Sequence, residues 1–346
     1  MPVLSMERKT ISVIIPVHNG GENFRRCLTS LAESATHPDE IIVVADGDSD
    51  GSWRMAEGFN TEILKLPTPG GPARARNMGT QKAKGDIFFF VDADVTIPKD
   101  AVAKVISAFQ HEPDLAAVFG SYDDEPSEVN FLSQYKNLFH HYVHQTSNVE
   151  ASTFWGACGA IRQEIFFKMG GFDEGFRWPS IEDIELGYRL KRAGYRIRLL
   201  KTLNVKHLKH WGVLSLLKAD FFYRALPWTR LILKGVEFPD DLNLKISNRV
   251  SVASVYLLII ALLGSFYIPW LLIMVFLPLL LLLFLNRDLY WFFNQKRGIF
   301  FMLKTIPWHW FYFFYSGLGF MIGLIAYSFN RIKTRHSGEN RSPEPL

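Results

Sequence analysis

The strongest constraint in this sequence is a long stretch without charge in its C-terminal third. Residues 250–285 contain no Asp, Glu, Lys or Arg. As one helix this stretch would be about 54 Å long, whereas the hydrocarbon core of a bilayer is about 30 Å thick. We therefore expect two membrane segments that turn near Pro269. The predicted transmembrane region covers residues 250–330, with two to four segments at about 250–268, 270–285 and 308–329.

Basic residues flank these segments and give conflicting signals about the number of crossings. They are Arg287, Lys296, Arg297 and Lys304 within 286–304, and Arg331, Lys333, Arg335 and Arg341 in the tail 331–346. Basic loops face the cytoplasm, so both groups are predicted there. Three crossings would place one group outside. Either the number of crossings is even, or one segment is re-entrant or interfacial.

Residues 211–249 mix aromatic rings such as Trp211 and Trp228 with basic heads such as Lys218 and Arg230. This combination is typical of helices that lie in the headgroup layer of a membrane. An ordinary amphipathic pair packed on the N-terminal domain is the alternative, and the position beside a membrane segment favours the interface.

Residues 1–210 resemble a soluble α/β domain in their patterning. Near-continuous apolar runs at 11–16, 40–45, 61–66 and 86–91 alternate with stretches of helical spacing at 22–35, 52–59, 73–84 and 99–110. Such runs suit strands buried on both faces, so we expect a doubly wound, mostly parallel sheet. Ligands of such sheets bind at the carboxyl ends of the strands.

Charge and cysteine content narrow the possible partners. The formal net charge is only +4, and no basic arm or zinc-finger spacing occurs, so no nucleic-acid partner is expected. Cys27 and Cys158 form no C-x-x-C pair. A disulfide framework is not implied, and a reducing cytoplasm suits the soluble part.

An acidic turn, DGDSDG at 46–51, follows the second predicted strand. With Glu57 it matches the calcium-loop pattern of an EF-hand, but an EF-hand needs a helix before the loop, and here a strand precedes it. At a strand end, Asp46 and Asp48 can instead accept hydrogen bonds from a nucleotide base or ribose.

A second acidic pair, Asp92 and Asp94, follows the strand at 86–91. Two carboxylates one residue apart suit Mg²⁺ or Mn²⁺, which bind carboxylates together with substrate phosphates and waters. His207, at the end of an apolar run, is a candidate third ligand or diphosphate contact. Gly70 and Gly71 lead into a helix with Arg76, which can donate to a phosphate.

The last cluster opens a predicted helix that ends near Arg192. Glu182 and Asp183 have two possible roles. Either they stabilise the first turn of the helix by interacting with its dipole, or one of them is a general base that deprotonates an acceptor hydroxyl. Trp155 and Trp178 are candidate aromatic walls for a sugar or acceptor, although core packing explains them equally well.

Taken in order, these segments resemble the inverting family 2 glycosyltransferases, which have the GT-A fold. The matching pieces are SVIIPVHNG, VVADGDSDGS, GPARARNMG, FFFVDADV, GGFDEGF and IEDIELGYRLKRAGYRI, within residues 11–210. The resemblance implies a membrane enzyme, with its catalytic domain in the cytoplasm, that takes a sugar from a nucleotide-sugar donor. An oligomeric state is compatible with this resemblance.

The resemblance also implies roles for single residues. Pro16, Asp46 and Arg76 match nucleotide and diphosphate contacts, and Asp94 and His207 match metal-site positions. By the same resemblance, Asp92 and Asp48 are further contacts of the nucleotide-sugar donor. Asp183 is the catalytic base. Ala45 stands where the family often has an acidic residue, and the Q-x-x-R-W segment of processive synthases is absent, which favours a single transfer.

The acceptor is inferred from the acidic pair. A phosphate is already ionised and needs no base, whereas an alcohol does, so a hydroxyl-bearing lipid or lipid-linked glycan is favoured over a polyprenyl phosphate. The alternatives are a polyprenyl-phosphate sugar synthase and a membrane-tethered nucleotide-sugar-binding subunit without turnover. A transporter is excluded because the predicted spans contain no deep ionisable residue.

Overall fold

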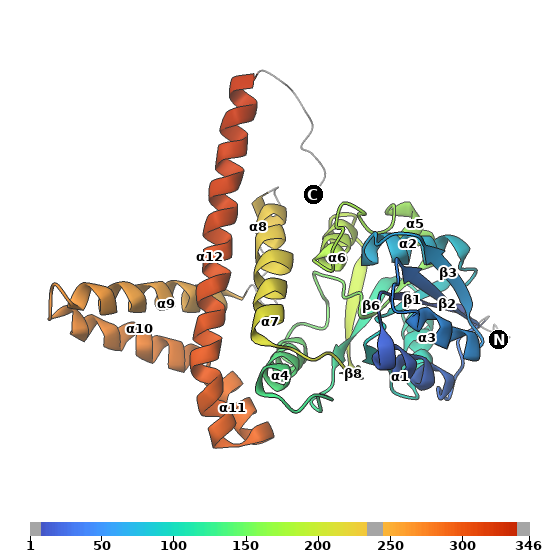
Figure 1. Cartoon of the computed structure of the whole chain (residues 1–346), viewed down its shortest axis with the longest axis horizontal. Helices are drawn as coiled ribbons and strands as arrows, with labels where there is room; N and C mark the ends of the chain where they lie inside the picture. The colour runs from blue at the N-terminus through green and yellow to red at the C-terminus, as the bar shows by residue number, and fades with distance from the viewer. Residues whose placement is uncertain (1–7, 234–244, 338–346) are drawn as a thin grey trace, which may run out of the picture. The chain divides into compact units, whose positions relative to one another are not determined.

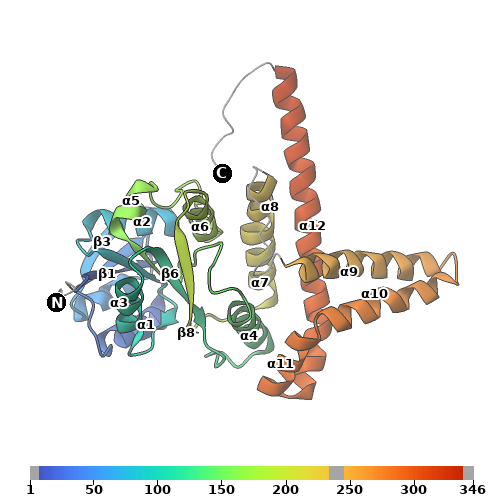
Figure 2. The same cartoon turned by 180° about the vertical axis from the view of Figure 1, so that it is seen from behind.

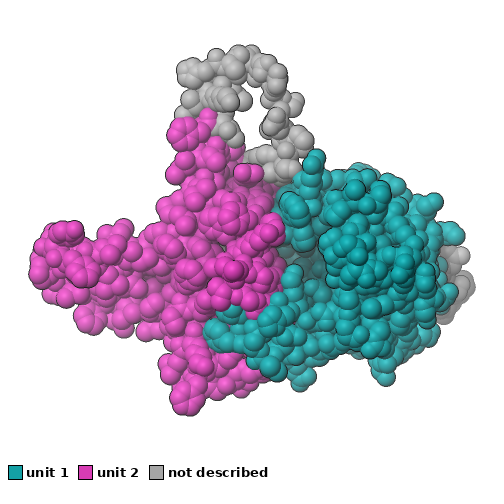
Figure 3. Space-filling model, in the orientation of Figure 1, with its two compact units in different colours: residues 1–133, 144–210, 346 teal, residues 134–143, 211–345 magenta. Residues whose placement is uncertain are grey.

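The computed structural model describes residues 8–233 and 245–337, which divide into two compact units (Figure 3). The described part of the first unit comprises residues 8–133 and 144–210. The second comprises residues 134–143, 211–233 and 245–337. The middle of one helix, α4, Phe131–Gln145, therefore belongs to the second unit.

The first unit is built on one sheet of eight strands in the order β3-β2-β1-β4-β7-β6-β8-β5 (Figure 1). The strands are β1 Ile11–Val17, β2 Glu40–Asp46, β3 Glu62–Leu66, β4 Ile87–Val91, β5 Val95–Thr96, β6 Leu115–Tyr122, β7 Cys158–Arg162 and β8 Arg196–His207. Strands β1 to β4 pair in parallel, and β7 runs antiparallel to both β4 and β6. The predicted alternation of strands and helices is confirmed, and the sheet becomes mixed from β7 onward.

Helices cover both faces of this sheet. They are α1 Gly21–Ala32, α2 Pro72–Lys82, α3 Ala101–His111, α5 Gln163–Lys168 and α6 Glu182–Arg192, with a 3₁₀ helix, η1, at Ser52–Gly58. Strand β4 shows why its sequence is apolar throughout. Phe89 packs in the core shared with α1 and α3, whereas Phe88 and Phe90 pack in the core shared with α2, α5 and α6. Both faces of the strand are buried, so no polar alternation is needed.

In the described part of the second unit all secondary-structure elements are helices. Its elements beyond α4 are α7 Val213–Asp220, the π-helical turn η2 Phe221–Ala225, α8 Leu226–Leu233, α9 Ile246–Ser265, α10 Leu271–Leu285, α11 Arg287–Arg297 and α12 Ile299–Ser337. Helices α9 and α10 run side by side as a hairpin in both views (Figures 1 and 2). Of the predicted tail 331–346, residues 331–337 continue α12, and 338–346 lie outside the described residues.

Length and composition identify two candidate membrane spans within the described residues, Ile246–Ser265 and Ile299–Phe329. A third is possible if Leu271–Leu285 and Arg287–Arg297, which meet at a bend of 58°, form one broken span. The predicted segments at 250–268 and 308–329 lie mostly within the first two. The predicted segment at 270–285 corresponds to α10, which contains Pro278 and does not qualify by itself.

Candidate active site

The segment Asp92-Ala93-Asp94, called the D-x-D segment below, follows the carboxyl end of β4 and lies beside the end of β8. Strand β5 follows Asp94 directly and pairs antiparallel with β8, so that Val95 lies opposite His207. The backbone N–H of Leu208 donates to the Asp94 carbonyl at 2.8 Å. As a result, Nε2 of His207 lies 3.6 Å from Oδ2 of Asp94. The two side chains predicted as metal ligands, 113 positions apart in the sequence by subtraction of their numbers, are neighbours.

These two side chains were predicted from the sequence to bind a divalent cation, and that role stays a prediction. Burial alone would raise the pKa of Asp94, but His207 and Lys209 outweigh it and lower the pKa to about 2, so the carboxylate is ionised at neutral pH. No group of three or more His, Cys, Asp or Glu side chains that could hold a metal occurs among the described residues. A carboxylate and an imidazole fit Mn²⁺ or Mg²⁺ if phosphates and waters complete the coordination.

Arg76 joins the D-x-D segment to the acidic pair of α6. Its Nη2 donates to Oδ1 of Asp92 at 2.8 Å, and its Nη1 donates to Oε1 of Glu182 at 2.8 Å. The guanidinium is buried, lies 5.3 Å from the centre of the Phe172 ring, and has its pKa raised by the two carboxylates, although burial opposes this. Its Nε has no hydrogen-bond partner. The residue predicted to contact phosphate is therefore held between two acidic side chains.

Glu182 and Asp183 have different surroundings, although they are adjacent. The second oxygen of Glu182 accepts a hydrogen bond from the backbone N–H of Ser180 at 3.0 Å, so both oxygens of this carboxylate are occupied. Asp183 forms no ion pair of this kind in the described residues, and its two oxygens accept hydrogen bonds from the backbone N–H groups of Gly156 at 2.9 Å and of Ile184 at 2.8 Å. Burial, and then the charge of Glu182, raise the pKa of Asp183 to about 7. A carboxyl group with such a pKa can exchange a proton near neutral pH.

Gly156 packs closely beside this cluster. A Cβ atom added there would lie 3.1 Å from Cζ of Arg76, so the guanidinium would have to shift by a few tenths of an ångström to accommodate a side chain. The same loop carries Trp155 next to the N–H that binds Asp183.

A row of aromatic rings extends from Trp155 to the Asp94 pair. The ring of Tyr122, at the end of β6, stacks on His207 with centroids 4.3 Å apart and an interplanar angle of 13°. Trp155 packs against Tyr122 in an edge-to-face arrangement, with ring centroids 4.8 Å apart and an interplanar angle of 86°. Tyr122 was not among the site residues predicted from the sequence. The feature that could have identified it is its position at the end of a strand. Trp178 is 64% exposed.

The residues predicted at the nucleotide form a second group. Both oxygens of Asp46 accept backbone hydrogen bonds, from Gly70 at 2.6 Å and Gly71 at 2.8 Å. Asp48 accepts from the N–H of Asn19 at 2.6 Å and from the Ser52 hydroxyl at 3.1 Å. Pro16 lies in β1, paired with Val44 of β2. These carboxylates shape the loops after β1, β2 and β3, and a contact of Asp46 or Asp48 with the base stays a prediction.

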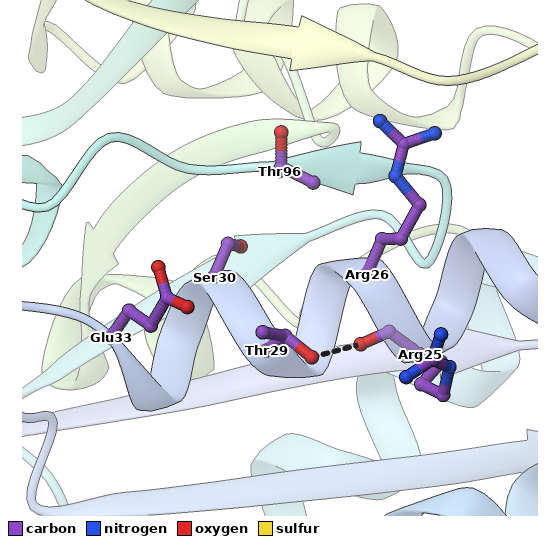
Figure 4. Close-up of a pocket in the computed structure, with 6 residues that line it drawn as sticks. All are labelled: Arg25, Arg26, Thr29, Ser30, Glu33 and Thr96. Carbon is purple, nitrogen blue, oxygen red and sulfur yellow. Dashed lines mark hydrogen bonds between the residues drawn. The ribbon is translucent and has the colours of Figure 1, made fainter.

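A shallow hollow of about 290 Å³ lies on α1 (Figure 4). Its lining consists of Arg25, Arg26, Thr29, Ser30, Glu33 and Thr96. None of the predicted site residues takes part in it, so it does not belong to the site described above.

Known proteins resemble this chain in sequence and fold. The family model described as glycosyl transferase family 2 matches residues 12–170, and a model described as the N-terminal domain of galactosyltransferase matches residues 137–211. The uncharacterized glycosyltransferase YfnE of Bacillus subtilis is 24% identical over 253 residues, which are 58% of this chain and 64% of that protein.

A poly-beta-1,6-N-acetyl-D-glucosamine synthase of Staphylococcus aureus is 27% identical over 202 residues, 56% of this chain and 48% of the synthase. The chain thus spans less than two thirds of the length of these curated relatives. Among solved structures, the mannosyltransferase PcManGT from Pyrobaculum calidifontis, in complex with GDP-Man and Mn²⁺, aligns with 91% of this chain and 88% of its own. Its TM-score is 0.61 at 18% identity, which establishes the shared fold.

Proposed function

The chain carries a glycosyl transferase family 2 domain over residues 12–170, and from this premise we propose that it is an inverting glycosyltransferase. It transfers one sugar from a nucleotide-sugar donor to a hydroxyl group of a membrane lipid or lipid-linked acceptor. The observation that carries the proposal is the Arg76 bridge, because it places the segment at Asp92 and Asp94 beside the segment at Glu182 and Asp183.

The reaction needs a proton acceptor on the acceptor side, and Asp183 is the residue proposed for it. The acceptor oxygen attacks the anomeric carbon, its proton passes to the Asp183 carboxylate, and the bond from the anomeric carbon to the phosphate oxygen breaks. The nucleoside diphosphate leaves from the opposite face, so the configuration inverts. Asp183 suits this role because its raised pKa makes it a stronger base than an ordinary carboxylate. Glu182 is instead held in a buried ion pair with Arg76, which supports a positioning role for Glu182.

Asp94 and His207 are proposed to hold a divalent cation together with the donor diphosphate. When bound, Mn²⁺ or Mg²⁺ would neutralise negative charge that develops on the leaving diphosphate. Asp94 supplies an ionised oxygen, and His207 supplies an imidazole nitrogen that the Tyr122 ring keeps in one orientation. The Mn²⁺ in the complex of the archaeal mannosyltransferase, which shares this fold, supports the same choice of ions.

The proposed acceptor is membrane-associated because the chain also carries long apolar helices with candidate spans. An alcohol is preferred over a phosphate because only the alcohol has a proton to lose to Asp183 at neutral pH. The proposal places the domain in the cytoplasm, where nucleotide sugars and the basic segments of the chain are expected.

A donor-binding screen tests this function directly. The full chain, purified in detergent, is heated with Mn²⁺ and each of several nucleoside diphosphates and their sugars. A nucleotide that binds the folded state raises Tm by mass action, and Asp94→Asn should reduce this shift. The Asp100→Asn variant, which changes a carboxylate in a surface ion pair with Lys104, is the matched control and should keep it. A panel in which no nucleotide shifts the wild-type Tm would contradict the proposal.

A further inference from the structure

The second unit contains a buried ionic cluster that bears on how the chain meets a membrane. Asp220, at the end of α7, accepts from Nζ of Lys136 at 2.6 Å and from Nη1 of Arg224 at 3.3 Å. Its other oxygen accepts from the hydroxyl of Tyr315 at 2.9 Å. Asp220 is 5% exposed, and the Lys136 side chain is 11% exposed.

Tyr315 lies near the middle of Ile299–Phe329, the longer of the two candidate spans among the described residues. If α12 crossed the bilayer over this segment, the cluster bonded to Tyr315 would lie close to the bilayer midplane. Charges at that depth are strongly unfavourable unless they are paired and shielded from lipid.

The helices packed along α12 also carry basic side chains that are exposed on the surface of the unit. Gly319 of α12 is close enough to Ala225 that an added Cβ would come within 2.7 Å of it, and Gly323 has the same relation to Thr229 of α8. On these helices Lys218 and Arg230 are exposed, and the Arg224 side chain is 43% exposed. A crossing α12 would carry these cations into the hydrocarbon. A surface-lying α12 leaves them among lipid headgroups, where cations are favoured.

The α9–α10 hairpin has the opposite character. Leu257, Ile260 and Leu263 of α9 and Ile273 and Leu277 of α10 are 59–71% exposed. At its open end the Asn286 side chain donates to the Ser251 hydroxyl at 3.1 Å. Arg249 and Arg287 flank that end in the sequence, and the turn at 266–270 has no charge.

Helix α12 contacts the hairpin near this polar end. The Tyr256 hydroxyl donates to the carbonyl of Phe314 at 2.8 Å, and Gly317 approaches Val252 and Tyr256. Beyond this contact the hairpin runs sideways away from α12 (Figures 1 and 2). If the hairpin enters the bilayer with its apolar end first, α12 is positioned along the membrane surface.

We propose that the α9–α10 hairpin enters the bilayer while α7, α8 and α12 lie in its interface, so that both ends of the hairpin and the end of α12 at Ser337 face the same side. The partner of the exposed hairpin is the lipid hydrocarbon, because a bilayer is the environment that solvates a charge-free apolar surface of this length. This arrangement resolves the conflict in the sequence. The basic residues of 286–304 and those of the tail then lie together, on the cytoplasmic side.

Cysteine labelling in sealed membrane vesicles tests the arrangement independently of sugar transfer. Cys27 and Cys158 are buried and are replaced by Ala, and single cysteines are then introduced as Gln81→Cys, Gln295→Cys and Ser342→Cys. Gln81 is on the exposed surface of α2 and reports the side of the first unit. A membrane-impermeant maleimide should label all three in the same vesicle orientation. Labelling of Ser342→Cys only in the opposite orientation, or in neither, would overturn the proposal.

A matched pair of lysine substitutions tests how deeply the hairpin and α12 lie in the membrane. Leu263→Lys places a cation on the hairpin, and Ile325→Lys places one on α12, at side chains of similar exposure, 61% and 55%. We expect Leu263→Lys to lower the fraction of protein retained in membranes after an alkaline wash at least severalfold, and Ile325→Lys to leave it unchanged, because an interfacial lysine reaches the headgroups. Equal losses from both variants would place α12 as deep as the hairpin and overturn the proposal.

Discussion

Arg76 and Glu182 form a buried ion pair, 2.8 Å from Nη1 to Oε1, that connects α2 with the first turn of α6. The same guanidinium holds Asp92 on its other side. The two acidic segments of the site therefore share one cation, and each depends on it for its position.

The Glu182→Gln variant should show how much this pair contributes to stability. Removing one partner of a buried ion pair typically destabilises a protein by about 3 kcal/mol or more, and in this variant Arg76 would keep only Asp92 as a paired carboxylate. We expect Tm to fall by about 6 °C or more in thermal unfolding of the full chain in detergent. Glu57→Gln, on an exposed side chain, is the control and should leave Tm unchanged. Equal Tm values for the two variants would show that the ion pair does not stabilise this fold.

The stacking of Tyr122 on His207 predicts a role in metal binding. Substituting Tyr122 by Ala frees the imidazole to rotate, and the loss of an orienting partner typically weakens metal binding by about 10-fold or more. Titration of the full chain with Mn²⁺ in the presence of a nucleoside diphosphate would measure this. Tyr122→Phe keeps the ring and should bind like the wild type. If Ala and Phe bind Mn²⁺ equally well, the ring does not orient His207.

Chelation tests the part assigned to Asp94 and His207. Complete removal of divalent ions by EDTA should abolish transfer, and added Mn²⁺ or Mg²⁺ should restore it, since these two side chains would otherwise face the donor diphosphate without a cation. The measurement is the initial transfer rate before chelation, after it and after re-addition. Undiminished transfer at full chelation would remove the metal role.

The raised pKa of Asp183 predicts a dependence of turnover on pH. With a pKa of about 7, the carboxyl is protonated below neutral pH and cannot accept the acceptor proton. The transfer rate at saturating donor should therefore rise with pH through about 7 and level off above it. The folded state holds this proton more tightly than the unfolded state does, so this group's contribution to stability decreases as pH rises toward 7. A rate that is flat from about pH 5.5 to 8.5 would argue against Asp183 as the base.

The strands could be predicted because β4 and its neighbours are buried on both faces, which gives continuous apolar runs that end in acidic turns. Asp94 and His207 could be named as candidate metal ligands from their residue types and from the resemblance, but their proximity could not be derived from the sequence, since β8 lies far from β4 along the chain. The partners of Arg76 could not be predicted, because a guanidinium binds phosphates and carboxylates by the same geometry. Tyr122 was missed because a lone aromatic residue at a strand end is usually part of the core. The membrane spans remained ambiguous because Asp220 meets Tyr315 only in the folded chain.

The Asp183→Asn variant tests the central claim most directly, because it removes the base and keeps the shape of the side chain. Transfer to the acceptor and donor binding are measured on the same preparation, with Asp100→Asn as the control. We expect transfer to fall by about 100-fold or more, while donor affinity stays at the wild-type value. Unchanged transfer, or a parallel loss of transfer, donor binding and stability, would contradict the assignment of Asp183 as the base.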